Sequence, residues 1–336
     1  MIPVPQPVLR TLAEAFGASA ESLSHFGGGQ EASDGTLYTY PYGDKRRLLK
    51  IMAIPVEDQR IGLLCFEERL RFLRFLGDHG AHIVFPQYSP PGNLYETCTR
   101  ENHIWVAYSM ELAPGKHRHE KTWDSDFFRN WGQTVGKLHH LAQDYPSWQA
   151  LSNPETGKDL LTWRREWESF HSWMQDEEVK AQWVALKQQL ETLPVVRDSF
   201  GFIHNDPHIW NLLVDGNRIT LLDFDVANHH WFINDIAIAC QSILIFQSGG
   251  LNGPVRDRTK LIAFLESFME GYELENHLSS EWLSRLDLFI NYRRMLLFTV
   301  LNNWIKSQPG LFDSWKGMIL SPPELVGDYF GAETGY

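Results

Sequence analysis

Residues 201–225 constrain the fold of this chain more than any other stretch, because polar side chains stand at the ends of two short apolar segments. Residues 212–214 and 219–222 are typical of strands, and Asp-Gly-Asn between them is typical of a hairpin turn. Folding the chain about this turn brings Asn211 to within about one residue of the position opposite Asp223. The sequence therefore predicts an amide and a carboxylate at one edge of a hairpin.

Asn211 and Asp223 are the candidate metal ligands. Their oxygens suit Mg²⁺, which takes few protein ligands alongside waters and substrate phosphates. Asp206 precedes Asn211 in a segment where Pro207 cannot continue a strand. We expect Asp206 on a loop beside the metal, placed to accept a proton. The alternative is a hairpin whose polar ends are only solvated.

The spacing of these residues resembles a known pair of functional loops. His-x-Asp-x4-Asn at 204–211, then a hairpin, then Asp-Phe-Asp at 223–225, is similar to the catalytic and metal-binding loops of the protein-kinase-like superfamily. His208, Trp210 and the final aspartate are most similar to the aminoglycoside phosphotransferase and choline kinase branch. Within that branch the chain resembles a bacterial group that includes a stress-response protein kinase and homoserine-kinase-like proteins.

The resemblance implies an α+β fold with two lobes. Residues 1–109 would form a small nucleotide-binding lobe with an antiparallel sheet. Residues 110–336 would form a larger, mostly helical lobe with the catalytic loop, the metal site and the acceptor pocket. The Trp-rich segment 147–197 is predicted to be helical and suits a wall of that pocket, although core packing is the commoner role of any one Trp.

Lys50 lies in the middle of a segment, 46–54, that is apolar on both faces and is predicted to be a buried strand. A lysine there must reach the strand edge or contact an anion. The resemblance supplies the anion, since Lys50 matches the lysine that contacts the α and β phosphates of ATP and pairs with a glutamate on the next helix. Glu68, inside the apolar stripe of a helix predicted near 58–76, is the candidate partner. Glu67, on a more polar face, is the alternative, and an exposed helical ion pair is the other role open to either one.

Gly27, Gly28 and Gly29 precede an alternating segment at 36–42. Glycines let backbone N–H groups approach phosphates. They hold the place of the family's glycine-rich nucleotide loop without its G-x-G-x-x-G pattern. A plain turn is the alternative.

The resemblance also implies supporting roles around Asp206, which would orient the acceptor hydroxyl and take its proton. His204 and His208 match positions that brace the loop, and Asp235 matches a buried aspartate that hydrogen-bonds the loop backbone. Asp225 replaces the glycine of Asp-Phe-Gly and could reach a second metal or a cationic acceptor. Further along the chain, Arg293 or Arg294 could meet an anionic acceptor, with a salt bridge as the default.

Composition limits the partners. The net charge of −12 and the pI near 5.6 argue against nucleic acid and anionic membrane surfaces. The acidity mildly favours an amine-bearing acceptor, or serves solubility alone. The three cysteines have no disulfide or zinc spacing, and no signal peptide or 18-residue apolar stretch is present, so we expect a cytoplasmic protein. The sequence does not indicate an oligomeric state.

These observations favour a Mg²⁺-dependent phosphotransferase that moves the γ-phosphoryl group of ATP or GTP to a hydroxyl of a small molecule. The acidity of the chain favours an acceptor that bears an amine. A Ser/Thr protein kinase is an alternative, against which stands the lack of an Ala-Pro-Glu segment or long activation loop after Asp225. A non-catalytic nucleotide-binding module is another. It is opposed by the joint presence of Lys50, Asp206, Asn211 and Asp223.

Overall fold

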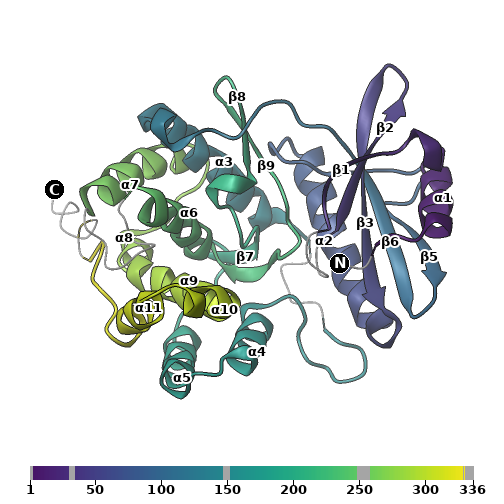
Figure 1. Ribbon diagram of the computed structural model, residues 1–336. Coiled ribbons are helices and arrows are strands. Elements are labelled where there is room, and N and C mark those ends of the chain that lie inside the picture. The colour runs from purple at the N-terminus through teal and green to yellow at the C-terminus, as the bar shows by residue number, and fades with distance from the viewer. Residues whose placement is uncertain (1–2, 30–34, 147–151, 248–257, 328, 330–336) are drawn as a thin grey trace. The chain divides into compact units, whose positions relative to one another are not determined.

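The computed structural model describes residues 3–29, 35–146, 152–247, 258–327 and 329. The chain divides into two compact units, Met1–Pro114 and Gly115–Tyr336 (Figure 1). The first unit is built on an antiparallel sheet and the second is mostly helical, which confirms the predicted α+β class. Within the described ranges, no helix is long and apolar enough to cross a membrane.

The described residues of the first unit form six strands in the order β1-β2-β3-β6-β4, with β5 also paired to β6. Every pairing is antiparallel. Its elements are α1 (Gln6–Ala15), η1 (Ala20–Ser22), β1 (Ser24–Gly28), β2 (Thr36–Tyr42), β3 (Lys45–Pro55), η2 (Val56–Asp58), α2 (Gln59–Asp78), β4 (Pro86–Gln87), β5 (Glu96–Arg100) and β6 (His103–Glu111).

The central strand β3 is buried on both faces, as its sequence predicts. Leu49 and Ile51 point into a core that α1 closes with its own apolar face. Lys50 points to the other face because side chains alternate along a strand. It pairs in register with Tyr108 of β6, whose ring lies 5.9 Å from that of Phe66 on α2. Lys50 therefore shares the face that α2 covers.

The second unit packs helices around two small β-ladders. Its elements are η3 (Glu120–Thr122), α3 (Ser125–Asp144), α4 (Trp163–Trp173), α5 (Glu177–Glu191), β7 (Phe200–Ile203), η4 (Ile209–Asn211), β8 (Leu212–Asp215), β9 (Arg218–Leu221), β10 (Asn228–Trp231), α6 (Phe232–Phe246), α7 (Arg258–Tyr272), α8 (Ser280–Leu283), α9 (Leu286–Val300), α10 (Asn302–Ser307) and α11 (Leu311–Leu320). Helices α4 and α5 occupy the Trp-rich segment, of which residues 147–151 lie outside the described residues.

The predicted hairpin is present as the antiparallel pair β8–β9, in which Leu212 faces Leu221. Gly216 turns it with a φ of +59°, a conformation that glycine adopts without steric cost. One step beyond the ladder, the Leu222 N–H donates to the Asn211 carbonyl at 2.9 Å. Asn211 is thus opposite Leu222, and Asp223 is the next residue, so the two candidate ligands leave the hairpin at the same edge.

Candidate active site

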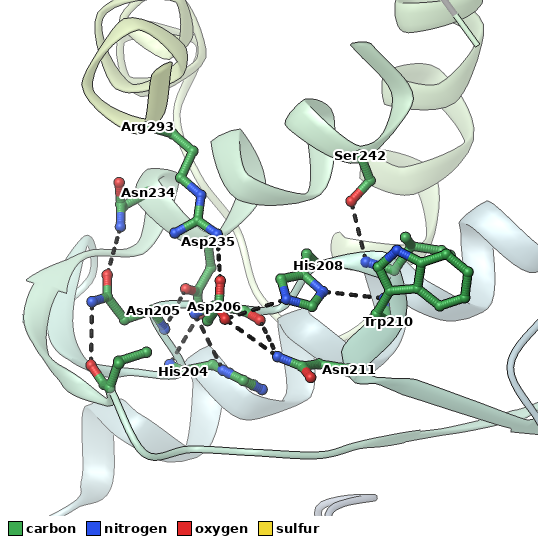
Figure 2. A network of polar contacts seen from close by, with 12 residues as sticks. His204, Asn205, Asp206, His208, Trp210, Asn211, Asn234, Asp235, Ser242 and Arg293 are labelled. Carbon is green, nitrogen blue, oxygen red and sulfur yellow. Dashed lines mark hydrogen bonds and ion pairs between the residues drawn. The ribbon is translucent and has the colours of Figure 1, made fainter. Parts of the chain in front are cut away.

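The loop between β7 and η4 is anchored through its backbone. The carboxylate of Asp235, in the first turn of α6, accepts hydrogen bonds from the N–H groups of His204 (3.1 Å) and Asn205 (2.8 Å). His139 of α3 places its Nε2 3.1 Å from the same carboxylate. Asp235 and His139 are fully buried, so these partners compensate a charge that would otherwise be costly to bury. Figure 2 shows the anchored loop, which carries Asp206.

His204 braces the loop against the hairpin. Its Nε2 donates to the Leu222 carbonyl at 2.8 Å, and its ring stacks on Phe224 with centroids 4.0 Å apart. Burial lowers the pKa of His204, against the pull of the neighbouring carboxylates of Asp235 and Asp206. The Nδ1 atom accepts from the Asp206 N–H at 3.3 Å. A neutral ring with its proton on Nε2 satisfies both contacts.

The Asp206 carboxylate is held from both sides. Arg293 of α9 donates to Oδ1 through Nη2, while His208 Nε2 lies 3.3 Å from Oδ2 (Figure 2). Burial alone would raise the pKa of Asp206, but the Arg293 guanidinium and the His208 contact outweigh it and hold that pKa well below its usual range. The group is therefore an ionised, oriented carboxylate.

Asn211 and Asp223 fit a hard divalent cation. The Asn211 amide nitrogen donates to the Asp206 carbonyl at 2.9 Å, so its oxygen points away from Asp206 (Figure 2). Asp223 is exposed at the hairpin edge with a φ of 58°, a strained conformation that clusters at functional sites. The described residues contain no group of three or more His, Cys, Asp or Glu that could hold a metal. One carboxylate and one amide oxygen suit Mg²⁺, which retains waters.

The remaining loop residues are placed as follows. Phe224 is buried, and Asp225 after it is partly exposed. The side chain of Asn205, at a φ of 65°, donates to the Val226 carbonyl at 3.2 Å and accepts from Asn234 Nδ2 at 2.8 Å. The role of Asp225 toward a second metal or a cationic acceptor stays a prediction.

The nucleotide candidates belong to the first unit. Lys50 and Glu68 are both buried, at 7% and 8% exposure, as the apolar patterns of β3 and α2 predict. Glu67 instead forms an i,i+4 ion pair with Arg71, the structural role left open for it. Glu68 thus stays the candidate partner of Lys50.

The predicted glycines lie at the end of β1. Gly28 and Gly29 have φ values of +73° and +70°. A Cβ on Gly28 would approach the Gly35 carbonyl to 2.1 Å, and one on Gly35 would meet the Lys50 Cε at 2.7 Å. Gly35 is not marked out by the sequence pattern, yet it lies directly over the Lys50 side chain.

The sequence pattern does not single out Glu166, and it singles out Arg293 without identifying its partner. Glu166 of α4 accepts hydrogen bonds from Asn205, from Asn228 (2.9 Å) and from the Tyr292 hydroxyl. Burial raises the pKa of Glu166, against these three donors and Arg293. For Arg293 or Arg294 the sequence leaves open an anionic acceptor, with a salt bridge as the default, and Arg293 forms a salt bridge with Asp206. Only its place in the apolar stripe of α9 signals that it points inward.

Together, the antiparallel unit with its buried strand lysine and the helical unit with its anchored His-x-Asp-x4-Asn loop define a phosphotransferase of the protein-kinase-like fold. The phosphotransferase enzyme family (APH) matches residues 46–282. The chain belongs to this family.

Individual relatives agree. The chain is 29% identical over 242 residues to amicoumacin kinase of Bacillus subtilis (strain 168), which covers 69% of this chain and 68% of that protein. A solved amicoumacin kinase, hAmiN in complex with AMP-PNP, Ca²⁺ and Ami, has a TM-score of 0.77 at 22% identity over 95% of this chain and 96% of that one. A microcompartment-associated aminopropanol kinase has a TM-score of 0.63 at 19% identity over 94% and 93%. The two structures share the fold.

The predicted family, fold and reaction class are therefore confirmed. The chain is an ATP-dependent phosphotransferase with a hydroxyl group of a small molecule as acceptor. A Ser/Thr protein kinase is not favoured. Enzymes of this class work with a nucleotide and a divalent metal ion.

Proposed function

We propose that the chain transfers the γ-phosphoryl group of ATP, with Mg²⁺, to a hydroxyl of an amine-bearing small molecule related to the acceptors of amicoumacin kinase and aminopropanol kinase. The observation that carries the proposal is the state of Asp206, an ionised carboxylate held by Arg293 and His208 beside the amide of Asn211. A cytoplasmic location, where ATP is supplied, is part of the same proposal.

Asp206 is proposed to orient the acceptor hydroxyl and to receive its proton. A carboxylate with a lowered pKa is a weak base, so orientation is its main contribution. This suits phosphoryl transfer, whose loose transition state asks for little activation of the attacking oxygen. His204 and Asp235 are proposed to act through the loop, by fixing the backbone on which Asp206 stands.

Asn211 and Asp223 are the proposed ligands of the metal ion. When bound, the ion neutralises phosphate charge. In the first unit Lys50, paired with Glu68, is proposed to contact the donor phosphates, and the backbone at Gly27, Gly28 and Gly29 to cover them. Asp225 stays a candidate for a second metal or for an acceptor cation.

The test is nucleotide consumption with Mg²⁺ across amicoumacin, amino-alcohols, homoserine, spectinomycin and neutral sugars. We expect turnover with an amine-bearing alcohol in the parent protein. Asp206→Asn should lower kcat about 10²–10⁴-fold while nucleotide affinity changes less than about twofold. Asp215→Asn, in the exposed turn of the same hairpin, is the matched control and should behave as the parent.

Two outcomes would contradict the proposal differently. Binding of Mg²⁺ and nucleotide without turnover of any acceptor would favour the non-catalytic nucleotide-binding module. Turnover that survives in Asp206→Asn would leave the kinase in place and remove Asp206 from its role.

A further inference from the structure

A pocket of about 150 Å³ lies in the second unit beside Asp206. We call it the α6–α9 pocket, and the lining residues that matter here are His208, Trp210, Gln241, Ser242, Phe246 and Arg293. We propose that this pocket binds an apolar or aromatic part of the acceptor that carries an uncharged amide group, with Gln241 and Arg293 as the specificity-determining residues. The inference rests on the proposed function and names the substrate class that it leaves open.

The pocket adjoins the reacting end of the site through two shared residues. His208 and Arg293 line the pocket, and both contact the Asp206 carboxylate. Figure 2 shows Arg293 descending to Asp206, with His208, Trp210 and Ser242 to one side. A molecule bound in the pocket therefore lies next to the group that would orient its hydroxyl.

Two buried polar atoms of the pocket lack a hydrogen-bond partner among the described residues. They are the amide oxygen Oε1 of Gln241 and Nε of Arg293. The two residues are only 6% and 8% exposed, so solvent does little to satisfy them. An unpaired buried polar group is unfavourable, because it has lost its hydrogen bonds to water and gained none in return. A ligand that supplied both partners would remove that cost.

An amide group of a ligand can pair with both atoms, because it carries an N–H donor and a carbonyl acceptor. A ligand N–H would donate to Gln241 Oε1, and a ligand carbonyl would accept from Arg293. Ser242 can assist, because its Oγ already accepts from the Ile209 N–H at 3.1 Å and keeps its hydrogen to donate. His208 Nδ1 accepts from the Trp210 N–H at 3.1 Å, so the proton on its ring is on Nε2, toward Asp206.

Charge argues against an ammonium group in this pocket. None of its lining residues within the described ranges carries a carboxylate, and Arg293 carries a positive charge. An ammonium group in the pocket would lie beside the guanidinium without a carboxylate to pair with, because Asp206 is already paired with Arg293 and His208. An amine on a part of the acceptor outside the pocket is compatible with this. The pocket would therefore bind the part that bears the amide and not the part that bears the amine.

The walls favour a flat apolar body. The rings of Trp210 and Phe246 lie 6.0 Å apart and are 56% and 39% exposed. Four further lining residues are aliphatic, namely Ile209, Ile238, Ile245 and Leu297. Apolar walls with a few placed polar groups are typical of small-molecule sites.

The experiment uses two alcohols of equal length, one with a benzoylamide and the other with a benzylamine at the same position. The parent protein should favour the amide at least 10-fold in kcat/KM. Gln241→Leu should raise KM for the amide about 10-fold, equivalent to about 1.4 kcal/mol, and leave kcat nearly unchanged. Gln241→Glu places a carboxylate in the pocket and should shift the preference at least 10-fold toward the amine.

Gln189→Glu, on the exposed face of α5, is the matched control and should keep the parent's preference. Calorimetry with the benzoylamide that lacks the hydroxyl gives a binding readout independent of turnover. Binding that is lost in Gln241→Leu, without turnover of any alcohol, would refute the proposed function and keep the pocket. Turnover with the same amide-to-amine ratio in the parent and both Gln241 variants would overturn the pocket inference.

Discussion

At the scale of single residues, Asp206 is fixed by partners from distant parts of the chain. Arg293 lies 87 positions away and contacts Oδ1, whereas His208 and Asn211 come from the same loop and approach Oδ2. Arg293 is nearly buried, with a side chain only 10% exposed, and Asp206 is 25% exposed. The ion pair between Arg293 and Asp206 is therefore largely desolvated, and removal of one partner leaves an uncompensated charge.

We predict that Arg293→Met lowers the free energy of unfolding by roughly 1–3 kcal/mol, below the range for fully buried pairs because Asp206 retains some solvent. In an Asp206→Asn background the same substitution should cost clearly less, since no carboxylate is left unpaired. Urea denaturation of the four proteins in the cycle measures the difference. Equal costs in the two backgrounds would show that Arg293 stabilises the protein only through packing.

The sequence predicts the local half of this arrangement. The His-x-Asp-x4-Asn spacing is enough to single out the loop, because turn chemistry and strand periodicity act over near neighbours. The apolar stripe of the last long helix includes Arg293 and so indicates that this arginine points inward. It does not say which group Arg293 contacts, because an inward-facing position does not identify its partner. In the structure Arg294 contacts Asn291 at 3.0 Å, and Arg293 takes the carboxylate.

At the scale of elements, the close contact of α3 with α7 depends on glycines. A Cβ on Gly132 would come within 1.8 Å of the Phe268 carbonyl, and one on Gly271 within 1.8 Å of the Arg129 carbonyl. The two helix backbones therefore touch where no side chain intervenes. This crossing also brings His139 of α3 to Tyr272 of α7 at 2.9 Å and to Asp235, so it supports the anchor of the catalytic loop.

We predict that Gly132→Ala destabilises the protein by about 1–3 kcal/mol or more, because the added methyl group meets backbone that must move. Gly317→Ala is the matched control, in α11, where a Cβ would have nothing within 4 Å. It should stabilise by up to about 1 kcal/mol through helix propensity. Thermal unfolding of both variants is the measurement, and similar effects at the two positions would contradict this view of the α3–α7 contact.

Helix α4 adds a second support at this scale. Its Glu166 binds Asn205 of the catalytic loop and Tyr292 of α9. The Trp-rich segment is expected from the sequence to wall the acceptor pocket. That role stays a prediction, and no described residue of the segment lines the α6–α9 pocket. The described contacts show that the segment holds the loop that carries Asp206.

At the scale of the whole molecule, each unit carries residues that are proposed to bind the nucleotide or its metal ion. Lys50 belongs to the first, and Asn211 and Asp223 belong to the second. Binding of a nucleotide with its metal ion should therefore stabilise the folded chain by mass action, by about 2.7 kcal/mol at one hundred times the dissociation constant.

We predict that a non-hydrolysable ATP analogue with Mg²⁺ raises Tm by several degrees and that EDTA removes most of the increase. Asn211→Ala should lose the metal-dependent part. Asn217→Ala, in the turn of the same hairpin, is the control and should keep it. The same increase with EDTA, or equal behaviour of the two variants, would exclude Asn211 as a ligand.

The sequence alone determined the local frame of this protein. The Asp-Gly-Asn turn defines the register that brings Asn211 beside Asp223, and the apolar pattern of residues 46–54 buries Lys50. Both can be predicted from the pattern of residue types among near neighbours in the chain. The same pattern carries the resemblance to the family and so indicates the reaction class, because both depend on residue types at fixed spacing.

The tertiary structure decided which distant groups complete that frame. Arg293 on Asp206, Glu166 on Asn205 and the glycine contact of α3 with α7 all join segments far apart in sequence. The two unsatisfied atoms in the α6–α9 pocket, on Gln241 and Arg293, also come from segments far apart in sequence. Such contacts depend on how each helix is rotated and packed. The periodicity of the sequence does not determine this, because it shows which positions face inward but not which residues they contact.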